Sequence, residues 1–314
     1  MAHKVGLLVG RERSFPEALI AEVARRGAGV EVEYARIEAT RSDRPPLYDV
    51  LVDRISHEVT CYQPVLKLAA LHGTRVINNP FWRIADDKFF NTALAQQLGV
   101  AVPRTAVLPS RQFSSDITAA SLERNLAFVD WEALAADLGG YPLYLKPHWG
   151  GGWKDVSRAE SREALLATYD RTGTLTMMVQ EEIRWTQYVR CIVVGQETVL
   201  PALWDPRQSH FERYTRAAES MPPLSPALEA RVVRDAQTLC RALGYDMNTV
   251  EFAVRDGVPY AIDFMNSAPD LDASSLGPAH FAWVIEKMAD LVISAALDRS
   301  RAPRHHWSAL LGTP

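Results

Sequence analysis

Two acidic side chains in the last third of the chain could bind a divalent cation. Residues 248–266 (NTVEFAVRDGVPYAIDFMN) alternate between apolar and other side chains, the period of half-buried strands, with a turn at residues 255–257. A three-residue loop with Gly257 in the left-handed region would place Glu251 and Asp263 on one face of the hairpin. Two carboxylates this close repel each other unless a positive ion lies between them. The pair therefore predicts a hard cation that is bound through oxygen and completed by phosphate.

A third oxygen ligand follows the hairpin. Asn266 stands just after the second predicted strand, where its amide oxygen could join the carboxylates of Glu251 and Asp263. The alternative for the acidic pair is a solvated face, because acidic residues are common on exposed strands.

Lys88 occupies a helix position that a cation normally avoids. It falls in the first turn of a predicted helix at residues 84–98, where the helix dipole disfavours positive charge. A lysine is favourable there when lysine and helix end together grip an anion. The alternative is a solvated lysine paired with Asp86 or Asp87.

A second lysine precedes a glycine-rich loop. Lys146 projects from the end of a predicted strand, and the sequence continues PHWGGGW, with glycines at 150–152. Three glycines have too little side chain to pack, so they suit a cover whose backbone N–H groups close over phosphates. Trp149 and Trp153 could anchor that cover. The alternative is a plain surface turn, since the spacing is not that of the P-loop G-x-x-x-x-G-K-[ST].

Arg190 is an awkward residue for its strand. It shares a face with Tyr188 and Ile192 in the segment YVRCIVV. A guanidinium among such neighbours needs an anion or a carboxylate, so a ligand contact and a structural ion pair both remain open.

Alternating strands and helices must position these residues. Strands at 4–10, 30–35, 48–54 and 75–78, with helices at 16–26 and 62–72, predict a small parallel α/β sheet. The segment GRERSF after the first strand lacks the G-x-G-x-x-G of a dinucleotide site, which argues against nicotinamide binding. Further along, the sequence predicts helices at 131–138, 226–243 and 278–297 and strands at 174–183, 188–194 and 198–204.

The composition indicates an ordinary globular protein. The chain has 314 residues, is 47% hydrophobic and carries a net charge of −4, so no global basic field attracts nucleic acid or an anionic membrane. The N-terminus lacks the apolar run of a signal peptide, and no apolar stretch of about 18 residues occurs. We expect a soluble, cytoplasmic protein with no nucleic-acid or membrane partner.

The ordered set of motifs resembles the ATP-grasp superfamily, in particular the branch of glutathione synthetase, D-alanine–D-alanine ligase and the ribosomal-protein glutamate ligase. The resemblance spans residues 1 to about 297. It is carried by NNPxxxxxADDK, LGVAVPRT, YLKPHWGGGW, VQEEI…YVRCIVVG and VEFAV…AIDFMN. It implies an α/β (α+β) ATP-grasp fold with an N-terminal, Rossmann-like pre-ATP-grasp domain, divided into residues 1–84, a central lid domain at 85–183 and a C-terminal metal-binding domain at 184–314.

The resemblance also implies a role for each candidate residue. Arg190 would be catalytic, steadying the transferring phosphoryl group or the acyl phosphate. The ATP-binding residues would be Lys88 and Lys146 on the α and β phosphates, Gly150, Gly151, Gly152 and Trp153 closing over the triphosphate, and Glu181, Glu182 and Ile183 reading adenine mainly through the backbone. The ligands of Mg²⁺ or Mn²⁺ would be Glu251, Asp263 and Asn266.

Three segments depart from the family pattern. The family usually has Glu-x-Asn at the second metal strand, whereas this chain has Asp263-Phe-Met-Asn266. Gln187-Tyr188 stand where an acidic residue is frequent, and SAPDLDASSLGP replaces a glycine-rich loop of the peptide ligases.

From these observations we expect an ATP- and magnesium-dependent ligase. It would activate a carboxylate as an acyl phosphate for attack by an amine of an amino acid or peptide, releasing ADP and phosphate. The alternatives are an ATP-grasp small-molecule kinase and a non-catalytic nucleotide-binding regulator. The expected partners are the small-molecule carboxylate and amine, and a homodimer is left open.

Overall fold

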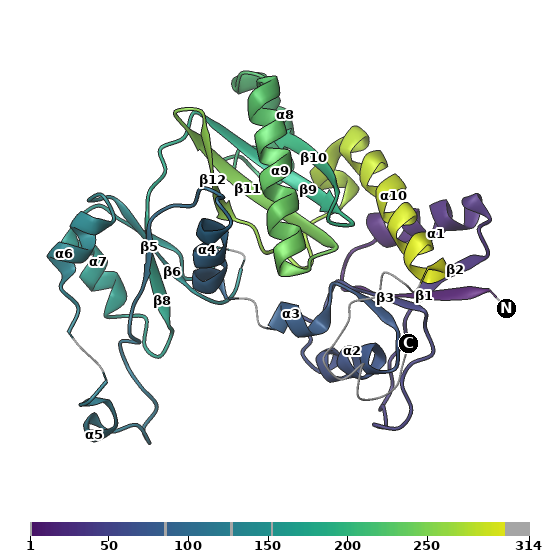
Figure 1. Cartoon of the computed structure of the whole chain (residues 1–314), viewed down its shortest axis with the longest axis horizontal. Helices are drawn as coiled ribbons and strands as arrows, with labels where there is room; N and C mark the ends of the chain where they lie inside the picture. Colours follow the sequence, from purple (N-terminus) through teal and green to yellow (C-terminus); the bar gives the residue numbers. More distant parts are fainter. Residues whose placement is uncertain (1, 85–86, 126–127, 152, 299–314) are drawn as a thin grey trace. The chain divides into compact units, whose positions relative to one another are not determined.

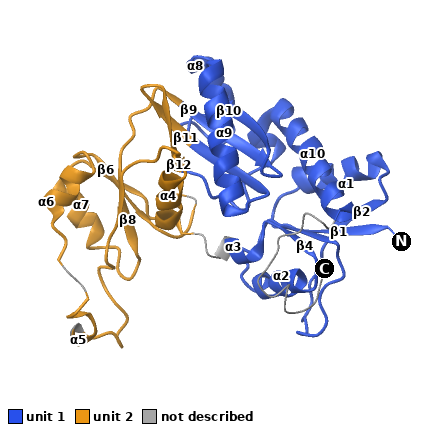
Figure 2. Cartoon of the chain, viewed as in Figure 1, with its two compact units in different colours: residues 1–85, 188–251, 263–314 blue, residues 86–187, 252–262 orange. Residues whose placement is uncertain are grey.

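Three four-stranded sheets form the framework of the chain (Figure 1). The structure is a computed structural model, and it describes residues 2–84, 87–125, 128–151 and 153–298. The chain divides into two compact units (Figure 2): unit 1 is residues 1–85, 188–251 and 263–314, and unit 2 is residues 86–187 and 252–262. The mixed α/β architecture confirms the predicted fold class, and the proposed division into three domains stays a prediction.

The first sheet belongs to unit 1 and is entirely parallel. Its parallel pairing confirms the prediction from strand–helix alternation, and its strand order is β2-β1-β3-β4. β3 is buried along its whole length, which suits its three apolar residues Val50, Leu51 and Val52. The elements are β1 (His3–Leu8), α1 (Ser14–Arg26), β2 (Val30–Tyr34), β3 (Val50–Asp53), α2 (Tyr62–Leu71), β4 (Arg75–Ile77) and α3 (Pro80–Ile84).

The second sheet has the strand order β10-β9-β11-β12. β9 pairs with β10 in antiparallel register, with Arg190 opposite Ala202. α9 follows Ser225, whose hydroxyl accepts a hydrogen bond from the backbone N–H of Leu228, and ends at Gly244, whose φ of 68° suits the left-handed cap position. The elements are β9 (Gln187–Val194), β10 (Thr198–Leu203), α8 (Arg213–Ser220), α9 (Pro226–Leu243), β11 (Met247–Arg255), β12 (Val258–Asp263) and α10 (Ala273–Leu297).

The turn of the β11–β12 hairpin differs from the prediction. β11 ends at Arg255 and β12 starts at Val258, so the loop has two residues rather than three. Asp256 and Gly257 have φ values of 53° and 74°, the two left-handed positions of a type I′ turn, and Asp-Gly is a favoured sequence for it. The three-residue loop is therefore wrong. The tip of the hairpin, residues 252–262, belongs to unit 2, while Glu251 and Asp263 belong to unit 1.

Unit 2 is built on the antiparallel sheet β5-β8-β6-β7. Leu143 and Leu145 of β6 are fully buried and pack with Met177 and Val179 of β8 in its core. Tyr144 and Lys146 alternate with these leucines and are only partly buried, as the strand period predicts. The elements are α4 (Lys88–Gln97), β5 (Thr105–Val107), α5 (Ala119–Leu122), α6 (Trp131–Asp137), β6 (Leu143–Pro147), β7 (Ser157–Ala159), α7 (Arg162–Tyr169) and β8 (Met177–Glu181).

The helix predicted at residues 84–98 is divided. α3 ends at Ile84 and α4 starts at Lys88, because the Asp87 carboxylate accepts hydrogen bonds from the backbone N–H groups of Phe89 and Phe90 and caps a new helix. Ala85 and Asp86 lie outside the described residues. The apolar residues Phe90 and Leu98 of this segment are exposed. The buried face of α4 consists instead of Asn91, Thr92 and Ala95.

The C-terminal helix contains a break. The predicted helix at 278–297 is the main section of α10, and Gly277, with φ 73° and ψ 168°, separates it from a preceding turn that Asp272 caps. None of the helices in the described part of the chain combines the length and apolar composition that crossing a bilayer requires.

Candidate functional site

Arg190 and Glu251 form a buried ion pair in unit 1. The Nε atom of Arg190 lies 3.6 Å from Oε1 of Glu251, and their side chains are 8% and 14% exposed. Tyr188, two residues before Arg190 on β9, donates its hydroxyl hydrogen to Oε2 of Glu251 at 2.9 Å. The Arg190 side chain thus has the carboxylate partner that its position in the sequence required.

The Arg190 guanidinium has further polar neighbours. Its NH1 and NH2 groups donate to the hydroxyl of Tyr214 at 3.1 Å and to the hydroxyl of Thr249 at 3.3 Å. Its Cζ also lies 5.4 Å from the ring centroid of Trp204. The buried Nε makes no hydrogen bond with any residue that the structure describes. One donor of a buried cation is therefore available to an anionic group.

Glu251 and Asp263 interact electrostatically. Burial raises the pKa of the Glu251 carboxyl to about 7, the negative charge of Asp263 acts in the same direction, and the nearby Arg190 opposes both. A regular hairpin closed by a two-residue turn would place the side chains of Glu251 and Asp263 on opposite faces of the sheet. That the two side chains share one face therefore stays a prediction. Asp263 ends β12, where the ladder stops.

This donor set suits a divalent cation. Two carboxylates that disfavour each other's charge gain from a cation bound through oxygen, and burial of Glu251 strengthens that gain. Within the described ranges, the side chain of Asp263 forms no hydrogen bond or ion pair, and no cluster of three or more His, Cys, Asp or Glu side chains could hold a metal. The acidic part of a metal site would therefore consist of Glu251 and Asp263 alone.

Asn266 is held in place by a residue that the sequence did not indicate. The backbone N–H of Asn266 donates to the side-chain oxygen of Asn248 at 2.8 Å, and the amide of Asn248 donates to the carbonyl of Phe264 at 2.8 Å. Asn248 is fully buried, so these bonds fix the bend after β12. The extra residue in Asp263-Phe-Met-Asn266 is accommodated by this bend.

Lys88 contacts the glycine loop within unit 2. Its Nζ donates to the carbonyl of Gly150 at 2.6 Å, and its backbone N–H donates to the carbonyl of His148 at 3.0 Å. Asp87, the residue expected as an alternative partner of Lys88, pairs instead with Nδ1 of His148 at 2.9 Å. The first turn of α4 is therefore tied to the start of the loop.

The loop has the backbone that its glycines suggest. Gly150 has a φ of 105°, which side chains other than glycine rarely adopt, and Trp153 has a φ of 61°. Trp149 and Trp153 are 55% and 62% exposed, so neither ring is buried. Gly151 has open space around its Cα, and Gly152 lies outside the described residues. Lys146 on β6 begins this segment and has polar partners of its own.

The acidic side chains after β8 are engaged in ion pairs. Glu181 accepts hydrogen bonds from Arg104 at 3.0 Å and from Arg255 at 2.8 Å. Although burial raises the pKa of Glu181, these two arginines lower it by more. Hydrogen bonds from Arg158 lower the pKa of Glu182, and Ile183 is buried. The side chains of residues 181–183 are thus engaged in ion pairs or buried. This fits the expectation that the segment contacts adenine mainly through its backbone.

The predicted residues fall into one group in each unit. Unit 1 brings together Arg190, Glu251 and Asp263, and the Asn248 bridge places Asn266 after the same hairpin. Unit 2 brings Lys88 to Gly150 and places Lys146 and Glu181 on neighbouring strands, β6 and β8. That all of them serve one ligand stays a prediction.

Several polar partners escaped sequence analysis. Tyr214, Asn248 and the Asp87–His148 pair each complete the surroundings of a predicted residue. None belongs to a motif with fixed spacing. Asp87 alone carried a usable signal, because an Asp directly before a helical lysine is a common N-cap.

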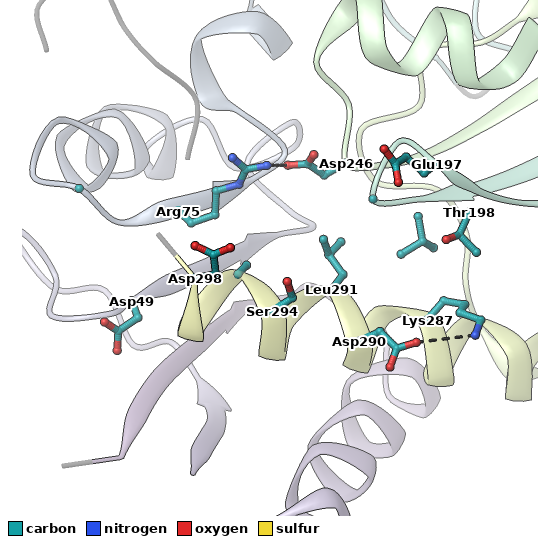
Figure 3. A pocket seen from close by; sticks show the side chains of 14 residues that line it. Asp49, Arg75, Glu197, Thr198, Asp246, Lys287, Asp290, Leu291, Ser294 and Asp298 are labelled. Carbon is teal, nitrogen blue, oxygen red and sulfur yellow. Dashed lines mark hydrogen bonds and ion pairs between the residues drawn. The ribbon is translucent and has the colours of Figure 1, made fainter. Parts of the chain in front are cut away.

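A separate pocket in unit 1 has the wrong charge for a phosphate site. It has a volume of about 240 Å³ and involves α10, the β9–β10 turn and the region of β3 and β4 (Figure 3). Its lining carries five acidic residues against two basic ones, Arg75 and Lys287. Arg75 pairs with Asp246 and Lys287 with Asp290, and none of the predicted site residues is part of the lining.

No family model matches the sequence. Two curated proteins of Clostridium perfringens are similar to it. D-alanine–D-alanine ligase of strain SM101 / Type A is 28% identical over 178 residues, or 52% of this chain and 57% of that protein. D-alanine–D-alanine ligase A of strain 13 / Type A is 26% identical over 178 residues with the same coverage. The chain thus spans just over half the length of the curated relatives it matches.

Solved structures resemble the chain over nearly its whole length. D-alanine–D-alanine ligase from Bacillus anthracis complexed with ATP has a TM-score of 0.63 at 16% identity, covering 96% of this chain and 100% of that one. A RimK domain ATP-grasp protein from Sphaerobacter thermophilus has a TM-score of 0.65 at 22% identity, covering 92% and 98%. The macrocyclase MdnC from Microcystis aeruginosa, bound with its precursor peptide MdnA, has a TM-score of 0.64 at 11% identity, covering 92% and 99%. At these identities the likeness concerns the fold.

Proposed function

We propose that this chain, a member of the ATP-grasp superfamily, is an ATP- and magnesium-dependent ligase that joins a carboxylate to an amine. The observation that carries the proposal is the buried group in unit 1. There, burial and the charge of Asp263 raise the pKa of Glu251 although the guanidinium of Arg190 lies beside it, so a bound cation would stabilise the Glu251 carboxylate. Burying these charged groups costs free energy, and such groups are typical of sites that bind or transform a charged ligand.

The unit 1 group would hold the metal. Glu251, Asp263 and Asn266 supply the carboxylate and amide oxygens that Mg²⁺ or Mn²⁺ prefers. When bound, the cation supplies charge neutralisation for phosphate oxygens. Arg190, whose Nε lacks a hydrogen-bond partner among the described residues, would stabilise negative charge on the transferring phosphoryl group.

The unit 2 group would hold ATP. Lys88 and Lys146 would contact the α and β phosphates, and the glycine loop at 150–153 would offer backbone N–H groups to the triphosphate. The carbonyl of Gly150 now accepts the Lys88 ammonium, so a phosphate would replace that partner. The segment Glu181–Ile183 would read adenine through its backbone, because both glutamate side chains are held by arginines.

The chemistry needs little beyond positioning and neutralisation. A substrate carboxylate would attack the γ phosphorus of ATP, giving an acyl phosphate and ADP. An amine would then attack the acyl carbon, and phosphate would leave. The relatives named as D-alanine–D-alanine ligases and the macrocyclase bound with a precursor peptide support an amino acid or peptide as the acceptor.

ADP formation tests the proposal. The purified chain is incubated with ATP, Mg²⁺ and the common amino acids, singly and in pairs, including D-alanine, and ADP and products are quantified. ADP release that requires both a carboxylate and an amine supports the ligase. A phosphorylated product without any amine would show a small-molecule kinase instead, and ATP binding without turnover would show a nucleotide-binding regulator.

A further inference from the structure

A histidine in unit 1 contacts an acidic residue and a buried serine. Nε2 of His210 is 3.0 Å from Oδ2 of Asp270 and 2.7 Å from Oγ of Ser275. Asp270 lies in the segment before α10, and Ser275 in its first turn. Asp272, the N-cap of α10, interacts with His210 through its charge. Burial raises the pKa of Asp272, but hydrogen bonds of Ser274 and the charge of His210 lower it by more.

The His210 ring is fixed on one edge and open on the other. Its Nε2 edge contacts Asp270 and Ser275, and its ring is nearly perpendicular to that of Phe211 at a centroid distance of 5.2 Å. No described residue makes a hydrogen bond to its Nδ1, and the side chain is 51% exposed. The Asp270 carboxylate favours the tautomer with the proton on Nε2, which leaves Nδ1 able to accept a proton.

Packing of α8 on α10 links the His210–Asp270 pair to the proposed phosphoryl-transfer group. The ring of Tyr214 on α8 lies 5.1 Å from the ring of His280 on α10, the helix that also carries Ser275, and the Asp270 charge adds to the effect of burial in raising the pKa of Tyr214. Tyr214 accepts a hydrogen bond from Arg190, which pairs with Glu251. Tyr214 is the second residue of α8, four positions after His210, so the same chain segment carries both.

The proposed ligase reaction needs a proton acceptor that the residues described so far do not provide. An amine is protonated at neutral pH and cannot attack carbon until it loses a proton. Arg190 remains charged, Glu251 and Asp263 are assigned to the cation, and the lysines are assigned to phosphate. An exposed imidazole held by a carboxylate meets the requirement.

We propose that His210 is the general base that deprotonates the acceptor amine, and that Asp270 and Ser275 position its ring; this rests on the proposed ligase function. Nδ1 takes one proton from the ammonium group, and the freed nitrogen forms a bond to the acyl carbon. The bond from that carbon to the phosphate oxygen breaks, and phosphate leaves with the electron pair. The second proton of the attacking nitrogen passes to the departing phosphate or to solvent.

Three variants and two nucleophiles test this assignment. His210→Asn removes the base, Asp270→Asn removes its orienting carboxylate, and His3→Asn is the control. His3 is also exposed, at 41%, and also pairs with a carboxylate, Asp49, at 3.5 Å. Each protein receives the carboxylate and amine pair selected by the ADP screen. In parallel, hydroxylamine replaces the amine. Hydroxylamine is already a free base at neutral pH, so it traps the acyl phosphate as a hydroxamate without help from a base.

The expected result is a selective loss. His210→Asn should lower kcat for amine ligation by about 10² to 10⁴-fold while hydroxamate formation stays within about twofold of wild type. The deficit should shrink as the pH rises and more of the amine is unprotonated. Asp270→Asn should lose less, about tenfold, and Asp270→Glu should recover part of that loss. His3→Asn should match the wild type in both assays.

Two outcomes would overturn the assignment. Equal losses in amine ligation and hydroxamate formation would mean that His210 supports the structure only, and an unchanged amine rate would mean that it has no role. Failure of the ligase proposal itself looks different, because the wild type would then form no hydroxamate with any carboxylate tested.

Discussion

At the scale of single residues, the most informative feature is a carboxylate kept buried beside a cation. Glu251 is held by Tyr188 and Arg190, yet its pKa is raised to about 7 by burial, with Asp263 adding to the effect. The native pairings therefore do not fully compensate the loss of solvation. A bound divalent cation would supply the missing compensation, which makes Asp263 the residue to test.

We expect Asp263→Asn to abolish magnesium-dependent turnover with only a modest change in melting temperature. The substitution keeps the shape and removes the charge that a hard cation needs, and the Asp263 side chain makes no hydrogen bond or ion pair with the described residues. Turnover is measured against Mg²⁺ concentration, and melting by calorimetry. Asp256→Asn is the matched control in the same hairpin, since asparagine tolerates its φ of 53°. Full activity in the Asp263 variant would refute the metal assignment.

Lys146→Ala should weaken ATP binding severely while the fold stays intact. Lys146 lies on the partly buried face of β6, opposite the core leucines, so its truncation leaves the core unchanged. Losing one phosphate contact from a charged group should cost about 10-fold or more in affinity. Calorimetric titration with an ATP analogue measures it, and Lys67→Ala on α2 serves as a lysine control. Equal affinities of wild type and Lys146 variant would remove the nucleotide assignment.

At the scale of elements, the sequence predicted periodic segments and missed those whose limits depend on caps or distant partners. The parallel sheet, α9 and the alternation in β6 follow from local pattern. The boundary between α3 and α4 does not, because the Asp87 cap outweighs a continuous apolar pattern. Likewise, the local preference of Asp256-Gly257 for a two-residue turn determines the loop length. The prediction of a three-residue loop rested instead on placing Glu251 and Asp263 on one face of the hairpin.

The shortest elements could not be predicted from the periodicity of apolar residues. β5 and β7 have three residues each, too few to show a period, and α8 lies in a strongly charged segment. The partners of Glu181 show the same limit at the site. Arg104 is 77 residues away in sequence and Arg255 is 74, and no local signal links them to that glutamate.

The turn before α8 should respond to acid. Asp205, with its side chain 1% exposed, accepts hydrogen bonds from Arg207 and Gln208, and the Arg207 bonds lower its pKa to about 2 although burial opposes them. Because the folded-state pKa lies below the unfolded one, Asp205 stabilises the chain above about pH 4. That contribution is lost as the pH falls from about 4 to about 2.

We therefore expect Asp205→Asn to lower the free energy of unfolding by about 1 kcal/mol at pH 7. The value is set below the full pKa shift because Arg207 is 67% exposed and solvent screens the pair. Urea titrations at pH 7 and at steps down to pH 3 measure it, and the difference from wild type should narrow with acidification. Asp43→Asn, in an exposed pair with Arg41, should change little at any pH. A difference that is the same at both ends of the series would exclude a charge effect.

At the scale of the whole molecule, the candidate residues are shared between two compact units with separate cores. The proposed metal ligands are in unit 1, and the proposed phosphate ligands are in unit 2. From sequence, the ordered motifs indicated both groups, because each motif is local. Their supporting contacts could not be inferred from spacing: Asn248 is on the same strand as Glu251 but holds the bend 18 residues later, and Tyr214 reaches Arg190 from α8.

This division makes a prediction about ligand-linked stability. A ligand that binds only the folded state stabilises it by about 2.7 kcal/mol at a concentration 100 times its Kd. If ATP needs both groups, a non-hydrolysable ATP analogue with Mg²⁺ should raise the melting temperature of the wild type. Chelation of Mg²⁺ by EDTA should remove most of that rise, since the phosphates would lose the cation that joins them to Glu251 and Asp263.

The two substitutions then become a test of interdependence. Lys146→Ala in unit 2 and Asp263→Asn in unit 1 should each abolish most of the rise, and the double variant should lose no more than either alone, because one ligand reports on both. Scanning calorimetry at several analogue concentrations gives the comparison. If the Asp263 variant is stabilised by the analogue and Mg²⁺ as strongly as the wild type, nucleotide binding does not depend on the carboxylates of unit 1. The lysines and the acidic pair would then serve different ligands.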